Sequence, residues 1–88
     1  MAEQFGRNLR RWRLKRDLSG EQVSQLADID RSAVWLIEKG KRLPDLETLI
    51  KLAGALGIEP DELLRGIGFR AAKGQRPAGL YIRGQRQS

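Results

Sequence analysis

Residues 18–44 read LSGEQVSQLADIDRSAVWLIEKGKRLP, and the capping signals within this stretch decide the fold. Ser19 is followed three residues later by Gln22. This spacing predicts a capping box, in which the serine oxygen accepts a backbone N–H and the glutamine side chain reaches back to the cap. We therefore expect a short helix over 20–27, which ends at Asp28 because aspartate tolerates the left-handed conformation of a helix C-terminus.

A second helix is predicted directly after the first. Asp30 is a favourable N-cap for a helix over 31–39, and Gly40 ends it. Only residues 28–30 connect the two helices. Two short helices joined by so tight a turn have the geometry of a helix-turn-helix, whose second helix can enter a major groove of DNA. Helical hairpins that bind nothing share this spacing, so geometry alone leaves both interpretations open.

Three more helices are expected around this pair. Apolar residues one turn apart predict an amphipathic helix over 3–16. A fourth helix is expected over 46–56, and a fifth, short one starts at Pro60. The positions expected to face the core are Phe5, Leu9 and Trp12 in the first helix, Leu49, Ile50, Leu52, Ala53 and Leu56 in the fourth, and Leu63 and Leu64 in the fifth. The sequence thus predicts an all-α domain over 1–66.

The last part of the chain, residues 67–88, differs in composition. Glycines and Pro77 interrupt it, no helical period is present, and 80–82 is the only run that favours a strand. It carries five cations and no acid. We expect a Gly-rich basic C-terminal extension that is mostly flexible or contributes to dimerisation.

The charges are distributed unevenly along the chain. The total is +6, with a net +4 over 1–44, −3 over 45–65 and +5 over 66–88. A basic face beside an acidic segment favours a polyanion bound on one side, although a solvated charged surface has the same composition. Cysteine and histidine are both absent, which excludes disulfides, thiolate zinc sites and the usual general base. We expect no enzymatic activity, no metal and no cofactor.

The stretch 18–44, with IEKGKRLP at 37–44 and LETLIKLAGALGIEPDELL at 46–64, resembles the helix-turn-helix of the Cro/repressor (XRE-type) transcription regulators. The resemblance covers about residues 4–65. It implies a compact five-helix lambda-repressor-like DNA-binding domain, usually a homodimer on a palindromic operator. Double-stranded DNA is then the expected partner, and the expected location is the cytoplasm, in association with the nucleoid.

The resemblance also assigns roles to residues at the start of the third helix. It implies that DNA bases are read by Arg31, Ser32, Trp35 and Leu36. Arginine can bind guanine O6 and N7 with two hydrogen bonds, serine can bond several base edges, and leucine can contact a thymine methyl. The alternative for Arg31 is a phosphate contact, and the alternative for Trp35 is packing or contact with a protein partner.

Other positions match backbone-contacting and structural residues of the family. The implied contacts to the DNA backbone come from Ser19 and from three loop cations, Lys39, Lys41 and Arg42, for which the alternative is a solvated loop. Arg13 and Glu38 match a structural pair that bridges the first and third helices. The family commonly has glutamine where this chain has Gly20, so one phosphate contact is missing.

Three functions compete at this stage. The leading hypothesis is a small sequence-specific repressor, whose homodimer contact we expect at Leu64, Ile67 and Phe69. A protein-interaction module on the same fold, antitoxin-like or bridging, is the second; it would use the apolar part of the recognition helix. The third, nonspecific coating of nucleic acid by the basic tail, leaves the folded motif without a role. No run approaches the roughly 18 apolar residues of a membrane span, so no membrane partner is expected.

Overall fold

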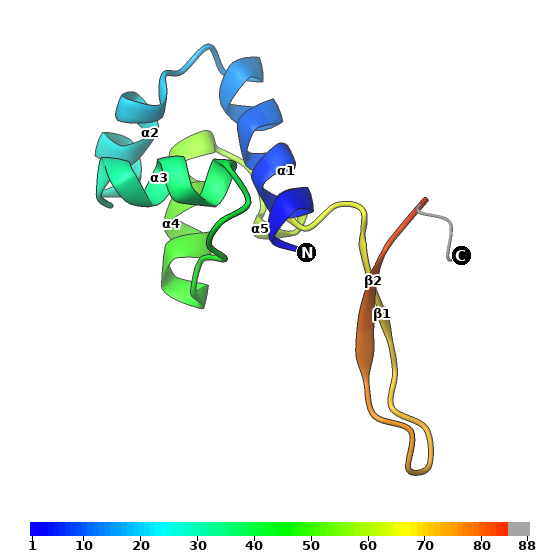
Figure 1. Cartoon of the computed structure of the whole chain (residues 1–88). Coiled ribbons are helices and arrows are strands. Elements are labelled where there is room, and N and C mark those ends of the chain that lie inside the picture. The colour runs from blue at the N-terminus through cyan, green and yellow to red at the C-terminus, as the bar shows by residue number, and fades with distance from the viewer. Residues whose placement is uncertain (85–88) are drawn as a thin grey trace.

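Five helices are followed by a two-stranded antiparallel hairpin in the computed structural model, which describes residues 1–84 (Figure 1). The elements are α1 (Ala2–Lys15), α2 (Gly20–Ala27), α3 (Arg31–Glu38), α4 (Leu46–Leu56), α5 (Pro60–Leu63), β1 (Ile67–Arg70) and β2 (Gly79–Ile82). The prediction of five helices is confirmed, with ends that lie within one residue of those expected. The last four residues of the predicted tail lie outside the described residues.

Local capping residues set the limits of α2, as the sequence predicts. Ser19 Oγ accepts a hydrogen bond from the backbone N–H of Gln22 at 3.0 Å, and the N–H of Ser19 donates to Gln22 Oε1 at 2.8 Å. Asp28 ends the helix in the left-handed region, with φ 55°. The capping box and the C-terminal cap are therefore confirmed, and together they fix the tight turn that leads into α3.

The core draws on all five helices. It comprises Phe5, Leu9, Val23, Ala27, Val34, Ile37, Leu52, Ala53, Leu56 and Leu63. Two of the predicted core positions are wrong, since Ile50 is 54% exposed and Leu64 is 39% exposed. The buried stripe of α4 follows the helical spacing through Leu52 and Leu56, and each residue turns about 100° from the last, so Ile50 falls outside the stripe.

A glycine in α1 allows α1 and α3 to pack closely. A Cβ atom at Gly6 would lie 2.5 Å from the carbonyl oxygen of Ile37 and 2.6 Å from that of Glu38. Only a residue without a side chain leaves room for these backbone atoms. The position of α3 against α1 therefore depends on Gly6, a residue for which the sequence pattern indicated no role.

The hairpin corrects the prediction of an all-α chain, and its second strand, β2, coincides with the run at 80–82 that the sequence favoured as a strand. β1 and β2 pair in one register from Ile67 opposite Ile82 to Arg70 opposite Gly79, and the pairing resumes between Lys73 and Arg76. The turn has a positive φ at its first central residue, Gly74, but not at its second, as a type II′ turn requires. Such a glycine lets two short strands pair where glycine content alone suggested disorder.

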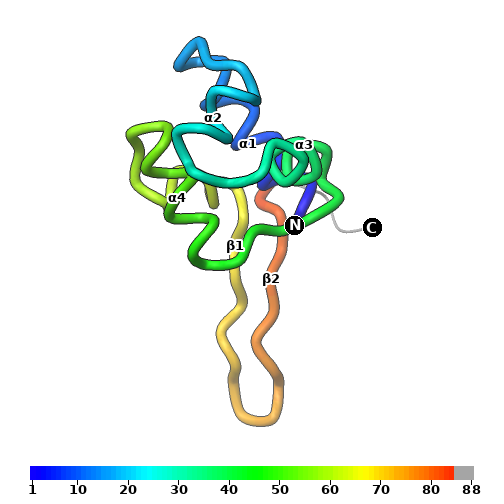
Figure 2. Tube along the Cα trace, turned by 90° about the vertical axis from the view of Figure 1, so that its left-hand side faces the viewer, coloured from blue at the N-terminus to red at the C-terminus, as the bar shows by residue number. Residues whose placement is uncertain are grey.

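The hairpin projects away from the helices, and its two strands run side by side below them in Figure 2. The described chain accordingly measures 45 × 25 × 22 Å along its principal axes. At the base of the hairpin, Ile67 packs against the core and the N–H of Arg83 donates to the carbonyl of Gly66 at 2.7 Å. The base is thus joined to the domain while most of the hairpin is exposed.

Candidate nucleic-acid interface

The outer face of α3 carries three of the four residues expected to read bases. Arg31 and Ser32 are exposed, and Trp35 is 53% exposed. Leu36, in the same helix, is only partly exposed. A partner that approaches α3 therefore meets one cation, one hydroxyl and one indole ring before it meets Leu36.

The Ser32 hydroxyl already has a partner within the chain. It donates to Asp30 Oδ2 at 2.6 Å, and this hydrogen bond is the main cause that lowers the pKa of the Asp30 carboxyl below its ordinary value. Asp30 precedes α3, but its side chain caps no backbone N–H there. Because the proton of Ser32 is engaged, its oxygen presents lone pairs to any further partner, which suits a donor such as a base amino group.

The three loop cations follow α3 directly and are all exposed. Lys41 Nζ lies 5.8 Å from the ring centroid of Trp35, so one of these cations also packs on α3. The N–H groups of Gly40 and Lys41 donate to the carbonyls of Ile37 and Leu36 at 3.0 and 2.9 Å, a Schellman-type ending of the helix. The loop is therefore ordered, with its cations beside the outer face of α3.

The turn of this loop also requires its glycine. Gly40 has φ +73°, and a Cβ atom there would lie 2.9 Å from Glu3 Cγ. The backbone of the loop thus packs against the first turn of α1. This contact helps to hold the loop in place.

A bidentate ion pair connects α1 to the end of α3. Arg13 Nε donates to Glu38 Oε2 at 2.8 Å and Arg13 Nη2 donates to Glu38 Oε1 at 3.0 Å. A third donation, from Arg13 Nη1 to the carbonyl of Leu18, reaches the connection between α1 and α2 at 3.0 Å. The side chains are only 15% and 9% exposed, so the pair is shielded from solvent and fixes the geometry of the helices.

A shallow hollow lies where the N-terminus of α2 meets α3. Among its lining residues are Arg10, Gly20, Glu21, Arg31, Trp35 and Lys39. No atom outside the local backbone lies within 4 Å of a Cβ built at Gly20, so the glycine leaves open space where the family commonly has a glutamine. Ser19 Oγ accepts the capping hydrogen bond, which leaves its proton free to donate to a phosphate. Three cations around one hollow suit an anion such as a phosphate group.

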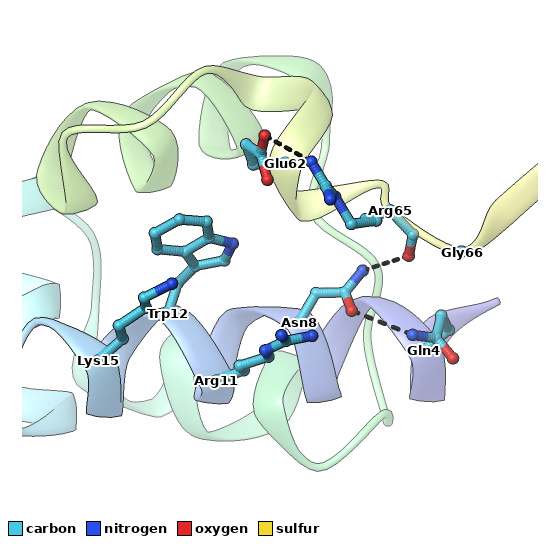
Figure 3. A pocket seen from close by; sticks show the side chains of 8 residues that line it. All are labelled: Gln4, Asn8, Arg11, Trp12, Lys15, Glu62, Arg65 and Gly66. Carbon is cyan, nitrogen blue, oxygen red and sulfur yellow. Dashed lines mark hydrogen bonds and ion pairs between the residues drawn. The ribbon is translucent and has the colours of Figure 1, made fainter.

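A set of polar contacts that the sequence did not predict connects α1 to the end of α5 (Figure 3). Asn8 is buried; its Nδ2 donates to the carbonyls of Leu63 at 2.9 Å and Arg65 at 2.8 Å, and its Oδ1 accepts from Gln4 Nε2 at 3.0 Å. A signal for this role is present in the sequence, because Asn8 lies on the same helical stripe as Phe5, where a polar residue needs a partner.

Arg16 makes a comparable contact, also not predicted. Its Nε donates to the carbonyl of Leu56, the last residue of α4, at 2.9 Å. A cation at that place satisfies a carbonyl left free at the end of the helix and opposes the helix dipole. The same guanidinium lies 5.3 Å from the centroid of the Trp12 ring, with Lys15 Nζ at 4.8 Å. Asn8 and Arg16 thus join α1 to the ends of α5 and α4.

Residues 1–84 contain neither a candidate metal site nor a candidate membrane-spanning helix. No group of three or more acidic side chains is arranged to hold a metal ion within this part of the chain. None of its helices combines the length and apolar character that a bilayer crossing requires. The cationic surface around α3 is therefore the strongest candidate site among the described residues.

Comparison with known proteins identifies relatives of the helical part. The helix-turn-helix family model HTH_3 matches residues 9–63. The chain is 37% identical over 62 residues to the prophage-derived, uncharacterised HTH-type transcriptional regulator YonR of Bacillus subtilis. This match covers 70% of this chain and 57% of YonR. It is 41% identical over 64 residues to the control protein C.MunI of a Mycoplasma species, and this match covers 72% of this chain and 86% of C.MunI.

A solved structure shares both the fold and much of the sequence. The restriction-modification controller protein C.AhdI from Aeromonas hydrophila superposes with a TM-score of 0.69 at 44% identity, over 70% of this chain and 94% of C.AhdI. The chain spans little more than half the length of YonR but nearly all of C.AhdI. The family match stops at residue 63, before the hairpin begins at Ile67.

Proposed function

The chain belongs to the helix-turn-helix family HTH_3, the XRE-type regulators, and from this premise we propose that it binds a specific double-stranded DNA operator through the outer face of α3. One observation carries the proposal. Arg31, Ser32 and Trp35 share an exposed face with the three loop cations beside it, and the shielded pair of Arg13 and Glu38 holds that face.

In this proposal the side chains on α3 contact bases, whereas Ser19 and the loop cations contact phosphates. Arg31 reads a guanine, Ser32 accepts a hydrogen bond from a base amino group, and the edge of Trp35 contacts a thymine methyl. Ser19 and the loop cations bind phosphates, which position the helix and supply salt-dependent affinity without sequence preference. Gly20 supplies no side chain to this set, so the loop cations carry a larger share of the backbone contacts.

We further propose that the DNA-binding form is a homodimer on a palindromic operator. A recognition helix of eight residues reaches only a few base pairs, so useful specificity requires two copies on half-sites about one DNA turn apart. The predicted contacts Leu64 and Phe69 are exposed in the single chain, at 39% and 76%, which leaves them accessible to a second copy.

The regulatory role that fits best is that of a small repressor. A dimer on an operator that overlaps a promoter excludes polymerase by occupancy alone, and the chain needs no further module for this. Similarity to the controller protein C.AhdI and to the control protein C.MunI supports transcriptional control of a restriction–modification system as the setting.

A protein partner at the recognition helix is the second candidate, and the exposure of Trp35 favours it. Two features weaken it. Leu36 is only partly exposed, and Lys41 lies against the indole ring, so the apolar surface of α3 is small and bordered by charge. Large exposed apolar patches are the usual mark of protein-binding surfaces.

Selection of bound genomic fragments tests the proposal. The purified full chain is mixed with sheared DNA from its source at two salt concentrations, and the retained fragments are sequenced. We expect a palindrome whose enrichment increases at the higher salt, because nonspecific backbone binding weakens first. Retention of all sequences alike at both salts would contradict specific operator binding.

A further inference from the structure

A second hollow lies between α1 and the end of α5, and its lining is mostly cationic (Figure 3). We call it the α1–α5 hollow. Its volume is about 480 Å³, which is within the range of small-molecule sites. Arg11, Lys15 and Arg65 border it, and Glu62 is the one acid among the described residues that line it. Three cations and one acid give this lining a net charge of +2.

The α1–α5 hollow lies on the side of α1 away from α3. Successive residues of a helix turn by about 100° around its axis. Arg10 and Arg13 border the hollow beside α3. Asn8, Arg11 and Lys15 border the α1–α5 hollow and fall on the opposite side of the helix. A DNA duplex bound to the outer face of α3 therefore leaves the α1–α5 hollow unoccupied.

The hydrogen-bond acceptors around the α1–α5 hollow already have donors within the chain. Glu62 Oε1 accepts from Arg65 Nη2 at 2.8 Å, and Gln4 Oε1 accepts from Arg7 Nη2 at 2.9 Å. Asn8 Oδ1 accepts from Gln4 Nε2, while Asn8 Nδ2 donates to two backbone carbonyls. These side chains hold the walls of the hollow together, and each of them is engaged.

The cations that α1 contributes are open by contrast. Within residues 1–84, neither Arg11 nor Lys15 forms an ion pair. The ring of Trp12 is contacted by Lys15 Nζ and by the Arg16 guanidinium, at 4.8 and 5.3 Å from its centroid. What the indole offers a ligand is its N–H, which lies at the edge of the ring that faces the hollow in Figure 3. The open groups are donors, so they suit a ligand with several acceptor atoms.

We propose that the α1–α5 hollow binds the phosphate group of a small phosphorylated molecule. A phosphate dianion matches the net charge of the lining, and arginine is well suited to hold phosphate oxygens. Its tetrahedral oxygens can accept from Arg11 and Lys15 on α1, from Arg65 across the hollow and from the N–H of Trp12, whereas a carboxylate presents its oxygens in one plane. The ligand adds a contact between α1 and the end of α5 to those of Asn8, and the site is independent of DNA binding at α3.

The two tryptophans of the chain allow the two hollows to be followed separately. Trp12 borders the α1–α5 hollow and Trp35 borders the hollow beside α3, and the chain has no third tryptophan. In a Trp35→Phe chain, tryptophan fluorescence therefore reports on Trp12. Titration of this chain with inorganic phosphate at constant ionic strength should give a saturable one-site change, with a dissociation constant on the order of 1 mM or below.

Two neighbouring arginines supply matched variants in the Trp35→Phe chain. Arg11→Gln removes a donor from the hollow and should raise the dissociation constant about tenfold, as the loss of one charge-assisted hydrogen bond does. Arg10→Gln makes the same change of charge on the other side of α1 and should leave the constant within about twofold, because physiological salt screens distant exposed charges. Both arginines are exposed, so both variants should keep the Tm of their parent.

Succinate tests the preference for phosphate, since it is a dianion with planar carboxylates. We expect it to bind about fivefold more weakly than phosphate, or worse. A response to phosphate that does not saturate, equal effects of the Arg10→Gln and Arg11→Gln variants, or succinate that binds as tightly as phosphate would overturn the inference.

A DNA duplex distinguishes a small ligand from nucleic acid. Added to the Trp35→Phe chain, the duplex should leave the fluorescence of Trp12 unchanged, because the α1–α5 hollow faces away from α3. A change with the duplex but not with phosphate would assign the hollow to DNA and overturn the inference. Failure of the fragment selection to recover an operator would refute operator binding and leave the phosphate titration unaffected.

Discussion

The close approach of α1 and α3 makes Gly6→Ala an informative substitution. Helix propensity alone favours alanine over glycine in a helix interior by about 1 kcal/mol. In this chain, however, the new Cβ atom would lie 2.5 Å from Ile37 O and 2.6 Å from Glu38 O, whereas ordinary contact begins at 3.4 Å. The helices would have to separate by about 0.9 Å, and backbone carbonyls cannot turn aside as a side chain can.

The clash outweighs the gain in propensity. Overpacking of a well-packed interior costs about 1–3 kcal/mol and occasionally more, and contact with two rigid carbonyls belongs at the upper end of that range. We expect a net loss of about 2 kcal/mol, which corresponds to a decrease in Tm of about 8–16 °C for a domain of this size.

A second glycine in a helix supplies the control. Gly54 in α4 is exposed, and no atom outside the local backbone lies within 4 Å of a Cβ built there. Gly54→Ala should therefore stabilise the chain by about 0.5–1 kcal/mol. Thermal and urea unfolding, followed by circular dichroism, compare both variants with the wild type. A Gly6→Ala chain as stable as the wild type would refute the close packing of α1 on α3.

Four further predictions concern the site and its supports. Arg31→Ala should lose about 1–3 kcal/mol of discrimination at one base position per half-site, and an equal loss for all sequences would make it a phosphate contact instead. Replacement of the three loop cations by glutamine should flatten the salt dependence of DNA binding by about one unit for each phosphate that is no longer neutralised, whereas Lys51→Gln on α4 should not. Glu38→Ala should destabilise the chain by about 3 kcal/mol, because it leaves Arg13 shielded and unpaired; an unchanged Tm would contradict this. The side chain of Thr48 is the main cause that lowers the pKa of the Asp45 carboxyl in the folded chain. The charged carboxylate therefore stabilises the fold above about pH 3.9, and this stabilisation is lost as the pH falls through the lower pKa of the folded state. The free energy of unfolding of the Asp45→Asn variant should accordingly decrease less than that of the wild type over an acidic pH series.

The helices were predictable because their signals are local. Ser19, Gln22 and Asp28 act on backbone groups within a few residues, so their spacing in the sequence specifies their structure. Asn8 and Gly6 act at long range, since Asn8 bonds carbonyls 55 and 57 residues away and Gly6 faces the end of α3. Nothing local to either residue reveals its partner.

The hairpin was predicted only in part, since the sequence favoured a strand at 80–82 but indicated no strand to pair with it. Its strands have four residues each, and glycines at Gly68 and Gly79 hide the alternation that marks a strand. Their purpose emerges only from the register, because they receive side chains from the strand opposite. The resemblance to a known family gave no help, since the family match ends before this segment. The roles of the base-reading residues remain predictions.

The contacts of α1 bear on operator spacing as well as on stability. This helix of 14 residues, about 21 Å long, holds α3 through Gly6 and Arg13 and holds the end of α5, from which the hairpin starts, through Asn8. The position of α3 relative to the end of α5 is therefore set by contacts with one helix. In the homodimer of the proposed function, with its contact at Leu64 and Phe69, substitution of Asn8 would change the number of base pairs tolerated between half-sites, while the bases chosen within each half-site stay the same.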